Sequence, residues 1–171
     1  MKGYIHIYTG NGKGKTTAAL GLALRAAGAG LKIYIAQFIK SGDYSEIIAL
    51  GAFSDRITIK QFGHGRFIKG KPSAEDVLEA RRGLKQICKI LCGNEYDLVI
   101  LDEANIAVAT QLFSENDLLE IMQAKPVGLE LIITGRGATD RVIERADLVT
   151  EMKEIKHYYH AGVKARTGIE K

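Results

Sequence analysis

The stretch that predicts the fold of this chain is Thr9-Gly10-Asn11-Gly12-Lys13-Gly14-Lys15-Thr16-Thr17, between an alternating apolar segment at 4–8 and a helical pattern at 18–27. Its three glycines allow tight backbone turns that aim successive N–H groups at phosphate oxygens. The N-terminus of the following helix adds unpaired donors and a positive dipole end. We therefore expect a phosphate-binding loop between a strand and a helix, although Thr9 stands where the usual pattern has glycine.

A second half of a nucleotide site follows the apolar run at 98–101, where Asp102 and Glu103 stand at the carboxyl end of the expected strand. Lys15 is placed to reach phosphates as a point charge, and the Thr16 hydroxyl is placed to bind Mg²⁺. We expect Asp102 to hold Mg²⁺ directly or through water. For Glu103 three alternatives stay open: it binds Mg²⁺ instead, acts as a base toward a water nucleophile, or only caps the next helix.

Short apolar runs rich in β-branched residues alternate with helical patterns along the chain. This alternation predicts a three-layer α/β fold of the P-loop type, in which a mainly parallel sheet carries helices on both faces. Ser73 with Asp76 and Ser114 with Asp117 have the spacing of helix N-caps. Strands are expected at 4–8, 32–38, 57–62, 98–101, 129–134 and 147–152, and loops at 41–54 and 63–71.

Length and composition indicate one domain over residues 1–171, with a C-terminal tail at 153–171 that we expect to be mobile. The net charge of +4 is spread along the chain without a basic patch of interleaved aromatic residues, so we expect no nucleic-acid partner. Cys88 and Cys92 share one helix face, and we expect them to pack as small hydrophobic residues. No apolar run is long enough to span a membrane, which predicts a cytoplasmic protein.

Six blocks of the sequence resemble, in the same order, the P-loop type of ATP:corrinoid adenosyltransferase, and they span nearly the whole chain. Single motifs such as Thr-Gly-Arg are weak, but the ordered co-occurrence of the six blocks is specific. The resemblance implies a RecA-like sheet, usually in a homodimer, with ATP and a reduced corrinoid as substrates. The blocks are residues 8–28, 37–40, 101–103, 134–137, 146–152 and 164–170.

The implied reaction is attack by the cobalt of the reduced corrinoid on the 5′ carbon of ATP, which transfers the 5′-deoxyadenosyl group and expels triphosphate. No side chain has to act as nucleophile, because the cobalt does so. We expect Lys15, Thr16 and Glu103 to act in catalysis by stabilising charge on the departing triphosphate. By resemblance, the ATP contacts are Gly10, Asn11, Gly12, Lys13, Gly14, Lys15, Thr16, Thr17 and Arg25, although Arg25 is otherwise an exposed helix residue.

The corrinoid side of the site matches the family less well. The family commonly carries a Phe-Thr-Trp segment against the lower face of the corrinoid, whereas this chain has residues 63–68 there and no Trp. Phe67 is either an apolar wedge in its place or a core residue. Arg136 is either a phosphate or corrinoid contact or a solvated turn residue. Tyr159 and Arg166 lie in the basic tail, which either folds over the corrinoid or frays.

Two other functions stay open at this stage. A P-loop ATPase, including one stimulated by nucleic acid, is favoured by the pI near 9.0 and by Glu103 as a base. An ATP-binding module without catalysis is favoured by the missing Trp. For adenosyl transfer, the resemblance implies an external reductant, a flavoprotein, that keeps the cobalt reduced.

Overall fold

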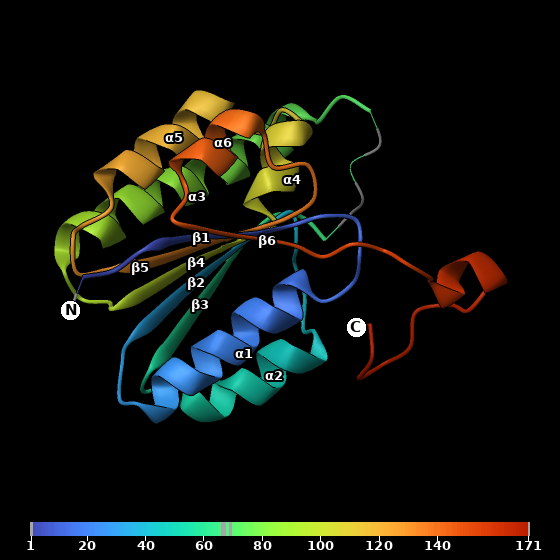
Figure 1. Ribbon diagram of the computed structural model, residues 1–171, viewed down its shortest axis with the longest axis horizontal. Coiled ribbons are helices and arrows are strands. Elements are labelled where there is room, and N and C mark those ends of the chain that lie inside the picture. Colours follow the sequence, from blue (N-terminus) through green and yellow to red (C-terminus); the bar gives the residue numbers. More distant parts are fainter. Residues whose placement is uncertain (1, 66–67, 69, 171) are drawn as a thin grey trace.

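In the described part of the chain, six parallel strands form one sheet with the order β3-β2-β4-β5-β1-β6 (Figure 1). The computed structural model describes residues 2–65, 68 and 70–170. All six strands predicted from the sequence are present, and their ends differ from the predictions by no more than one residue. The strands are β1 (Ile5–Thr9), β2 (Ile33–Phe38), β3 (Ile57–Phe62), β4 (Leu98–Asp102), β5 (Glu130–Thr134) and β6 (Leu148–Glu151).

The helix starts predicted from the sequence are confirmed. Helix α1 (Lys15–Gly28) begins within the glycine-rich loop. Helices α3 (Ala74–Gly93) and α5 (Glu115–Ala124) each follow a serine whose hydroxyl accepts a hydrogen bond from a backbone N–H three residues on, and both capping boxes are complete. The remaining helical segments are α2 (Ser45–Leu50), α4 (Ala104–Ala109), α6 (Asp140–Arg145) and the 3₁₀ turns η1 (Gly51–Phe53) and η2 (Tyr158–Ala161).

Helices cover both faces of the sheet, which confirms the predicted three-layer α/β fold. Helices α1 and α2 lie on one face, and α3, α4, α5 and α6 lie on the other (Figure 1). Each face has its own apolar core: Ile100 and Ile132 pack toward α1, whereas Val99 and Leu131 pack toward the face with four helices. Burial on both faces explains why the central strands β4 and β5 are continuously apolar in sequence.

The prediction of a loop over residues 41–54 is wrong, because α2 and η1 occupy much of this segment. Tyr44 precedes α2 without a side-chain cap, so no capping signal marks the helix in the sequence. Leu50 at its C-terminal end is buried in the core beneath α1. The helix is therefore stabilised by tertiary packing, which a local pattern does not reveal.

The prediction that the two cysteines pack as small hydrophobic residues is also wrong. Both lie on α3, but their side chains are exposed. The buried stripe of this helix runs through Ala80, Ile87 and Leu91, and each cysteine follows a stripe residue by one position. One position turns a side chain by about 100° around the helix axis, enough to move both thiols out of the core.

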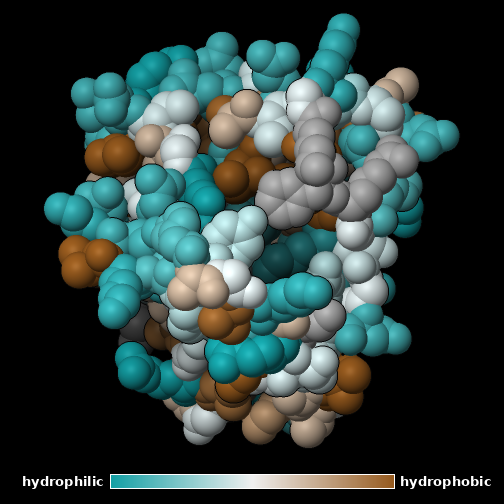
Figure 2. All heavy atoms as spheres, turned by 90° about the vertical axis from the view of Figure 1, so that its right-hand side faces the viewer, coloured by the Kyte–Doolittle hydropathy of each residue, from teal (hydrophilic) through white to brown (hydrophobic). Residues whose placement is uncertain are grey.

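The strand order decides which side chains meet at the carboxyl edge of the sheet. Strand β5 lies between β1 and β4, so Thr134 at its end stands between the phosphate loop and Asp102. On the other side of β4, Gln37 of β2 is in register with Asp102. Figure 2 views the molecule from this side, where polar side chains dominate and surround a recess.

Within the residues that the structure describes, no helix combines the length and the apolar character needed to cross a lipid bilayer.

Candidate active site

The loop between β1 and α1 has the backbone of an anion-binding site. Gly10 and Gly14 take φ angles of 92° and 117°, a region that side chains with a Cβ rarely adopt. Helix α1 begins at Lys15 without a side-chain cap, so its first N–H groups are available to a ligand. Together with the positive end of the helix dipole, these donors favour a bound phosphate.

Lys15 is folded over this loop. Its ammonium donates hydrogen bonds to the carbonyl oxygens of Gly10 and Gly12, both at 2.7 Å, and the residue is only 8% exposed. Burial, and then the positive charge of Arg136, lower the pKa of Lys15, while the charge of Glu103 opposes this shift. The lysine is therefore held at the mouth of the loop with only neutral acceptors, and a phosphate would supply the missing negative charge.

Asp102 is the centre of the second half of the site. Its side chain is fully buried, and its carboxylate accepts four hydrogen bonds. The hydroxyl groups of Thr16 and Thr134 donate to Oδ1 at 2.8 and 2.7 Å. The Gln37 amide and the Lys40 ammonium donate to Oδ2 at 3.0 and 2.8 Å. The fold thus brings three separate segments to one carboxylate: the start of α1, the end of β2 with the residues after it, and the end of β5.

The residues at this point fit a Mg²⁺ ion. Thr16 Oγ1 and Asp102 Oδ1 are hard oxygen donors from the start of α1 and the end of β4, and they lie 2.8 Å apart. Mg²⁺ in nucleotide sites is commonly held by one or two such oxygens, with waters and phosphate oxygens completing the shell. Both predicted oxygen donors are therefore adjacent to each other and to the phosphate loop.

Glu103 lies beside Asp102 in a strained backbone conformation, with a φ of 60°. Its N–H donates to the Thr134 hydroxyl at 3.0 Å, and its side chain makes no capping hydrogen bond to α4, which does not support the capping alternative. Burial, and then the charge of Asp102, raise the pKa of Glu103, although Lys40, Lys15 and Arg136 oppose the shift. The carboxyl group therefore faces the same cluster of cations that surrounds the phosphate loop.

Lys13, the other lysine of the loop, holds the C-terminal tail. Its ammonium donates to Tyr158 Oη at 2.9 Å, to the Ile169 carbonyl oxygen at 3.0 Å and to Glu170 Oε1 at 2.8 Å. The Gly12 N–H donates to the Met152 carbonyl oxygen at 2.6 Å. An open cleft of about 380 Å³ lies between the loop and the tail, lined by Gly12, Lys13 and residues 153–158.

Arg136 and Arg25 lie at different distances from the loop. Arg136 follows β5 between two glycines, and its charge acts on both Lys15 and Glu103. The Ala138 N–H donates to the Thr9 hydroxyl at 3.3 Å, so the unusual threonine of the loop motif ties the Arg136 segment to the loop. Arg25 is in the last turn of α1, roughly 15 Å along the helix axis from Lys15.

The family model described as ATP:corrinoid adenosyltransferase BtuR/CobO/CobP matches residues 1–170 of the chain. The chain belongs to this adenosyltransferase family. It is 35% identical over 170 residues to the corrinoid adenosyltransferase of Pseudomonas aeruginosa, a match that covers 99% of this chain and 84% of that protein. The corrinoid adenosyltransferase of Escherichia coli K12 is also 35% identical, over 99% of this chain and 86% of that protein.

A solved structure supports the fold of this adenosyltransferase family member. A KaiC-like protein from the archaeon Pyrococcus horikoshii superposes with a TM-score of 0.59 and 20% identity, over 91% of this chain and 75% of that chain. At this identity the likeness concerns the fold alone. It agrees with the RecA-like parallel sheet that the family resemblance implies.

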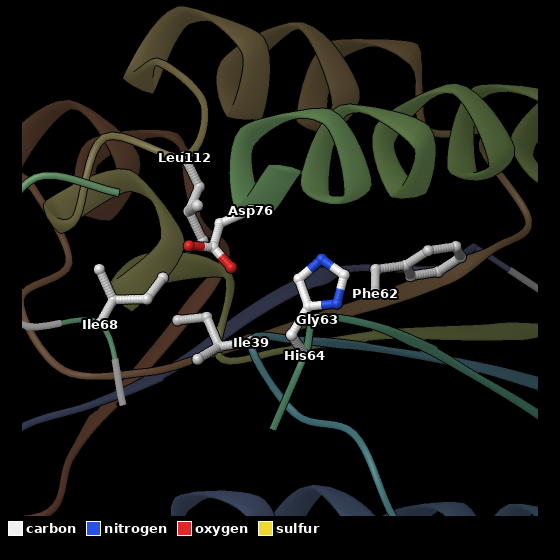
Figure 3. Close-up of a pocket in the computed structure, with 7 residues that line it drawn as sticks. All are labelled: Ile39, Phe62, Gly63, His64, Ile68, Asp76 and Leu112. Atoms are coloured by element: carbon white, nitrogen blue, oxygen red, sulfur yellow. The ribbon is translucent and has the colours of Figure 1, made fainter. Parts of the chain in front are cut away.

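The corrinoid side of the adenosyltransferase site is less defined. Phe67, the predicted apolar wedge, lies outside the described residues. Residues 63, 64 and 68 of the same segment line a small pocket with Ile39, Phe62, Asp76 and Leu112 near the start of α3 (Figure 3). Tyr159 and Arg166 are both exposed in the tail, where Arg166 pairs with Glu170 at 3.1 Å. These positions stay predictions for the corrinoid.

Sequence reasoning about this adenosyltransferase missed three residues that hold Asp102: Gln37, Lys40 and Thr134. Lys40 forms an ion pair with Asp102, and its pKa is raised because Asp102, Glu103 and Glu46 together outweigh the lowering effect of burial. A polar residue at the carboxyl end of an apolar strand was the available signal for Gln37 and Thr134. Their common target became visible only when the strands were placed side by side.

Proposed function

We propose that this chain transfers the 5′-deoxyadenosyl group of ATP to the cobalt of a reduced corrinoid and that the residues around the phosphate loop stabilise the departing triphosphate. Membership of the family supports ATP and a corrinoid as the two substrates. The observation that carries the assignment of residues is the contact of Thr16 Oγ1 with Asp102 Oδ1 at 2.8 Å beside an uncapped helix start.

The triphosphate would occupy the loop from Gly10 to Thr17. Loop N–H groups and the Lys15 ammonium would bind its oxygens, because helix α1 starts without a side-chain cap and the ammonium lies over the same loop. Thr16 and Asp102 would hold Mg²⁺, which neutralises part of the negative charge on a leaving phosphate group. Lys13 would join them once it exchanges Glu170 of the tail for a phosphate oxygen.

The bond changes balance without a protein nucleophile. The cobalt supplies the electron pair for the new cobalt–carbon bond, the bond between the 5′ carbon and its oxygen breaks, and triphosphate leaves with the two electrons of that broken carbon–oxygen bond. The protein therefore contributes position and charge, which are the terms that the loop and its cations provide. ATP hydrolysis, the main alternative, would instead need an activated water and would release ADP and phosphate.

The finer assignments are proposals of the same kind. We propose that Glu103 assists Mg²⁺ binding, that Asn11, Thr17 and Arg25 contact ATP, and that Phe67, Arg136, Tyr159 and Arg166 face the corrinoid. We further propose one domain over residues 1–171, a homodimer and a flavoprotein reductant. A location in the cytoplasm is consistent with the supply of ATP there.

One assay separates transfer from hydrolysis. The protein is incubated without oxygen with ATP, Mg²⁺ and chemically reduced cobalamin, and the phosphate products are separated by ion exchange. Transfer predicts triphosphate in equal amount to a light-sensitive cobalt–carbon product. ADP with inorganic phosphate and no such product would refute adenosyl transfer, and omission of cobalamin provides the control.

A further inference from the structure

Lys40 lies beside the oxygen atoms that would hold a metal ion. Its ammonium lies 2.8 Å from Asp102 Oδ2 and 3.4 Å from Thr16 Oγ1, and its side chain is 20% exposed. The proposed Mg²⁺ site uses the same carboxylate and the same hydroxyl. One positive charge therefore already lies next to the place where a second one is expected.

Two features of the chain around Lys40 hold it in this place: a strained backbone conformation directly before it and side-chain hydrogen bonds on either side of it. Ile39, directly before it, takes a φ of 68°, which is unfavourable for a β-branched residue. The Gln61 amide donates to Gln37 Oε1 at 3.1 Å and to the Gly42 carbonyl oxygen at 3.2 Å. These bonds connect Gly42, after Lys40, to Gln37, whose amide also donates to Asp102. Strain of this kind persists where the surrounding structure enforces it, often at functional sites.

The chemistry of Asp102 explains why a cation is needed. A fully buried carboxylate is costly unless a positive charge and hydrogen bonds compensate it. Gln37, Thr16 and Thr134 supply neutral donors, and Lys40 supplies the charge. A divalent ion at Oδ1 of the same carboxylate would repel the ammonium at Oδ2, so it would weaken the pair of Lys40 with Asp102.

We infer that Lys40 is a built-in stand-in for Mg²⁺: it pairs with Asp102 while the site lacks nucleotide and moves to the triphosphate when Mg²⁺ and ATP bind. This inference rests on the proposed Mg²⁺ site at Thr16 and Asp102. It makes metal binding depend on the nucleotide, because a phosphate oxygen must first give the ammonium a new partner. Free Mg²⁺ then competes poorly with the lysine.

The test measures binding of Mn²⁺, a paramagnetic substitute for Mg²⁺, to the nucleotide-free protein by the loss of the free-ion signal in electron paramagnetic resonance. Lys40→Met removes the charge, and Lys40→Gln removes the charge but keeps a hydrogen-bond donor for Asp102. Both variants are expected to bind Mn²⁺ about tenfold more tightly than the unmodified protein, because no cation competes for the carboxylate. If Lys40 had only a structural role, neither substitution would increase the affinity for Mn²⁺.

Controls separate this inference from the proposed metal site. Lys40→Arg keeps the charge and Lys60→Met removes an exposed lysine of β3, and neither is expected to increase Mn²⁺ binding. After rapid gel filtration removes free Mn²⁺ and the Mn²⁺–ATP complex, ATP is expected to cause Mn²⁺ to be retained with the unmodified protein, and Thr16→Val is expected to abolish that ATP-dependent Mn²⁺ binding. If that binding occurs but the Met and Gln variants gain no affinity without ATP, the role of Lys40 is refuted and the metal site stands. If it does not occur, both ideas are refuted.

Discussion

Thr134 is the residue whose replacement tests the Asp102 cluster most directly. Its side chain is fully buried, its hydroxyl donates to Asp102 Oδ1 at 2.7 Å, and its oxygen accepts from the Glu103 N–H at 3.0 Å. Thr134→Val keeps the shape but removes both bonds. Loss of a hydrogen bond to a charged group costs about 1.5–3 kcal/mol, and a buried N–H without a partner costs about 1–3 kcal/mol. We expect the free energy of unfolding to fall by about 3 kcal/mol.

Thermal and urea unfolding followed by circular dichroism measure this loss. For a domain of this size, about 3 kcal/mol corresponds to a fall in melting temperature of about 6–12 °C. Thr150→Val is the matched control, because Thr150 lies exposed on the edge strand β6, and we expect a change within about 0.5 kcal/mol. A loss below about 1 kcal/mol for Thr134→Val would show that the two hydrogen bonds do not hold the buried carboxylate as described.

Three further predictions concern the loop and its neighbours. Lys15→Ala is expected to lower triphosphate release by about 100-fold or more, because a charge aimed at the leaving group is lost, and a rate near that of the unmodified protein would argue against this role. Gly12→Ala would place a Cβ 2.6 Å from the Met152 carbonyl oxygen, so we expect urea unfolding to show a loss of about 1–3 kcal/mol, whereas Gly21→Ala, with open space around it, should not destabilise. The raised pKa of Glu103 means that the folded state binds its proton more tightly than the unfolded chain, so wild-type stability falls as pH rises above about 4.5 through the folded pKa. Glu103→Gln should escape this loss, and a stability difference that stays constant between about pH 4 and pH 7 would contradict it.

The three lysines near the phosphate loop each have acceptors within the protein. Lys13 is paired with Glu170 of the tail, and Lys40 is paired with Asp102. Lys15 is held by two carbonyl oxygens of its own loop. In the proposed reaction these acceptors would be replaced by the oxygens of the triphosphate, which carry more negative charge. Substrate binding would then exchange partners instead of ordering free side chains, which would lower its entropic cost.

Several parts of the fold follow from local sequence. The capping boxes at Ser73 and Ser114 involve only residues three positions apart, so they can be predicted locally. The strands are predicted by their short apolar runs. Other parts do not follow, since α2 lacks a side-chain cap and is stabilised by the burial of Leu50. The exposure of the cysteines depends on how α3 is rotated against the sheet. The helical periodicity is compatible with a buried face through Cys88 and Cys92, but the structure buries Ile87 and Leu91, one position earlier.

The sequence by itself determined the phosphate loop, the carboxylates after the fourth strand and the family, because these are short motifs with a mechanism in their own residues. Only the tertiary structure decided which side chains meet Asp102. Gln37, Lys40 and Thr134 are 65, 62 and 32 positions away from it in the chain. The physical reason is the parallel sheet, which brings the carboxyl ends of distant strands to one edge. There the buried carboxylate of Asp102 forms hydrogen bonds with residues that are far away in the sequence.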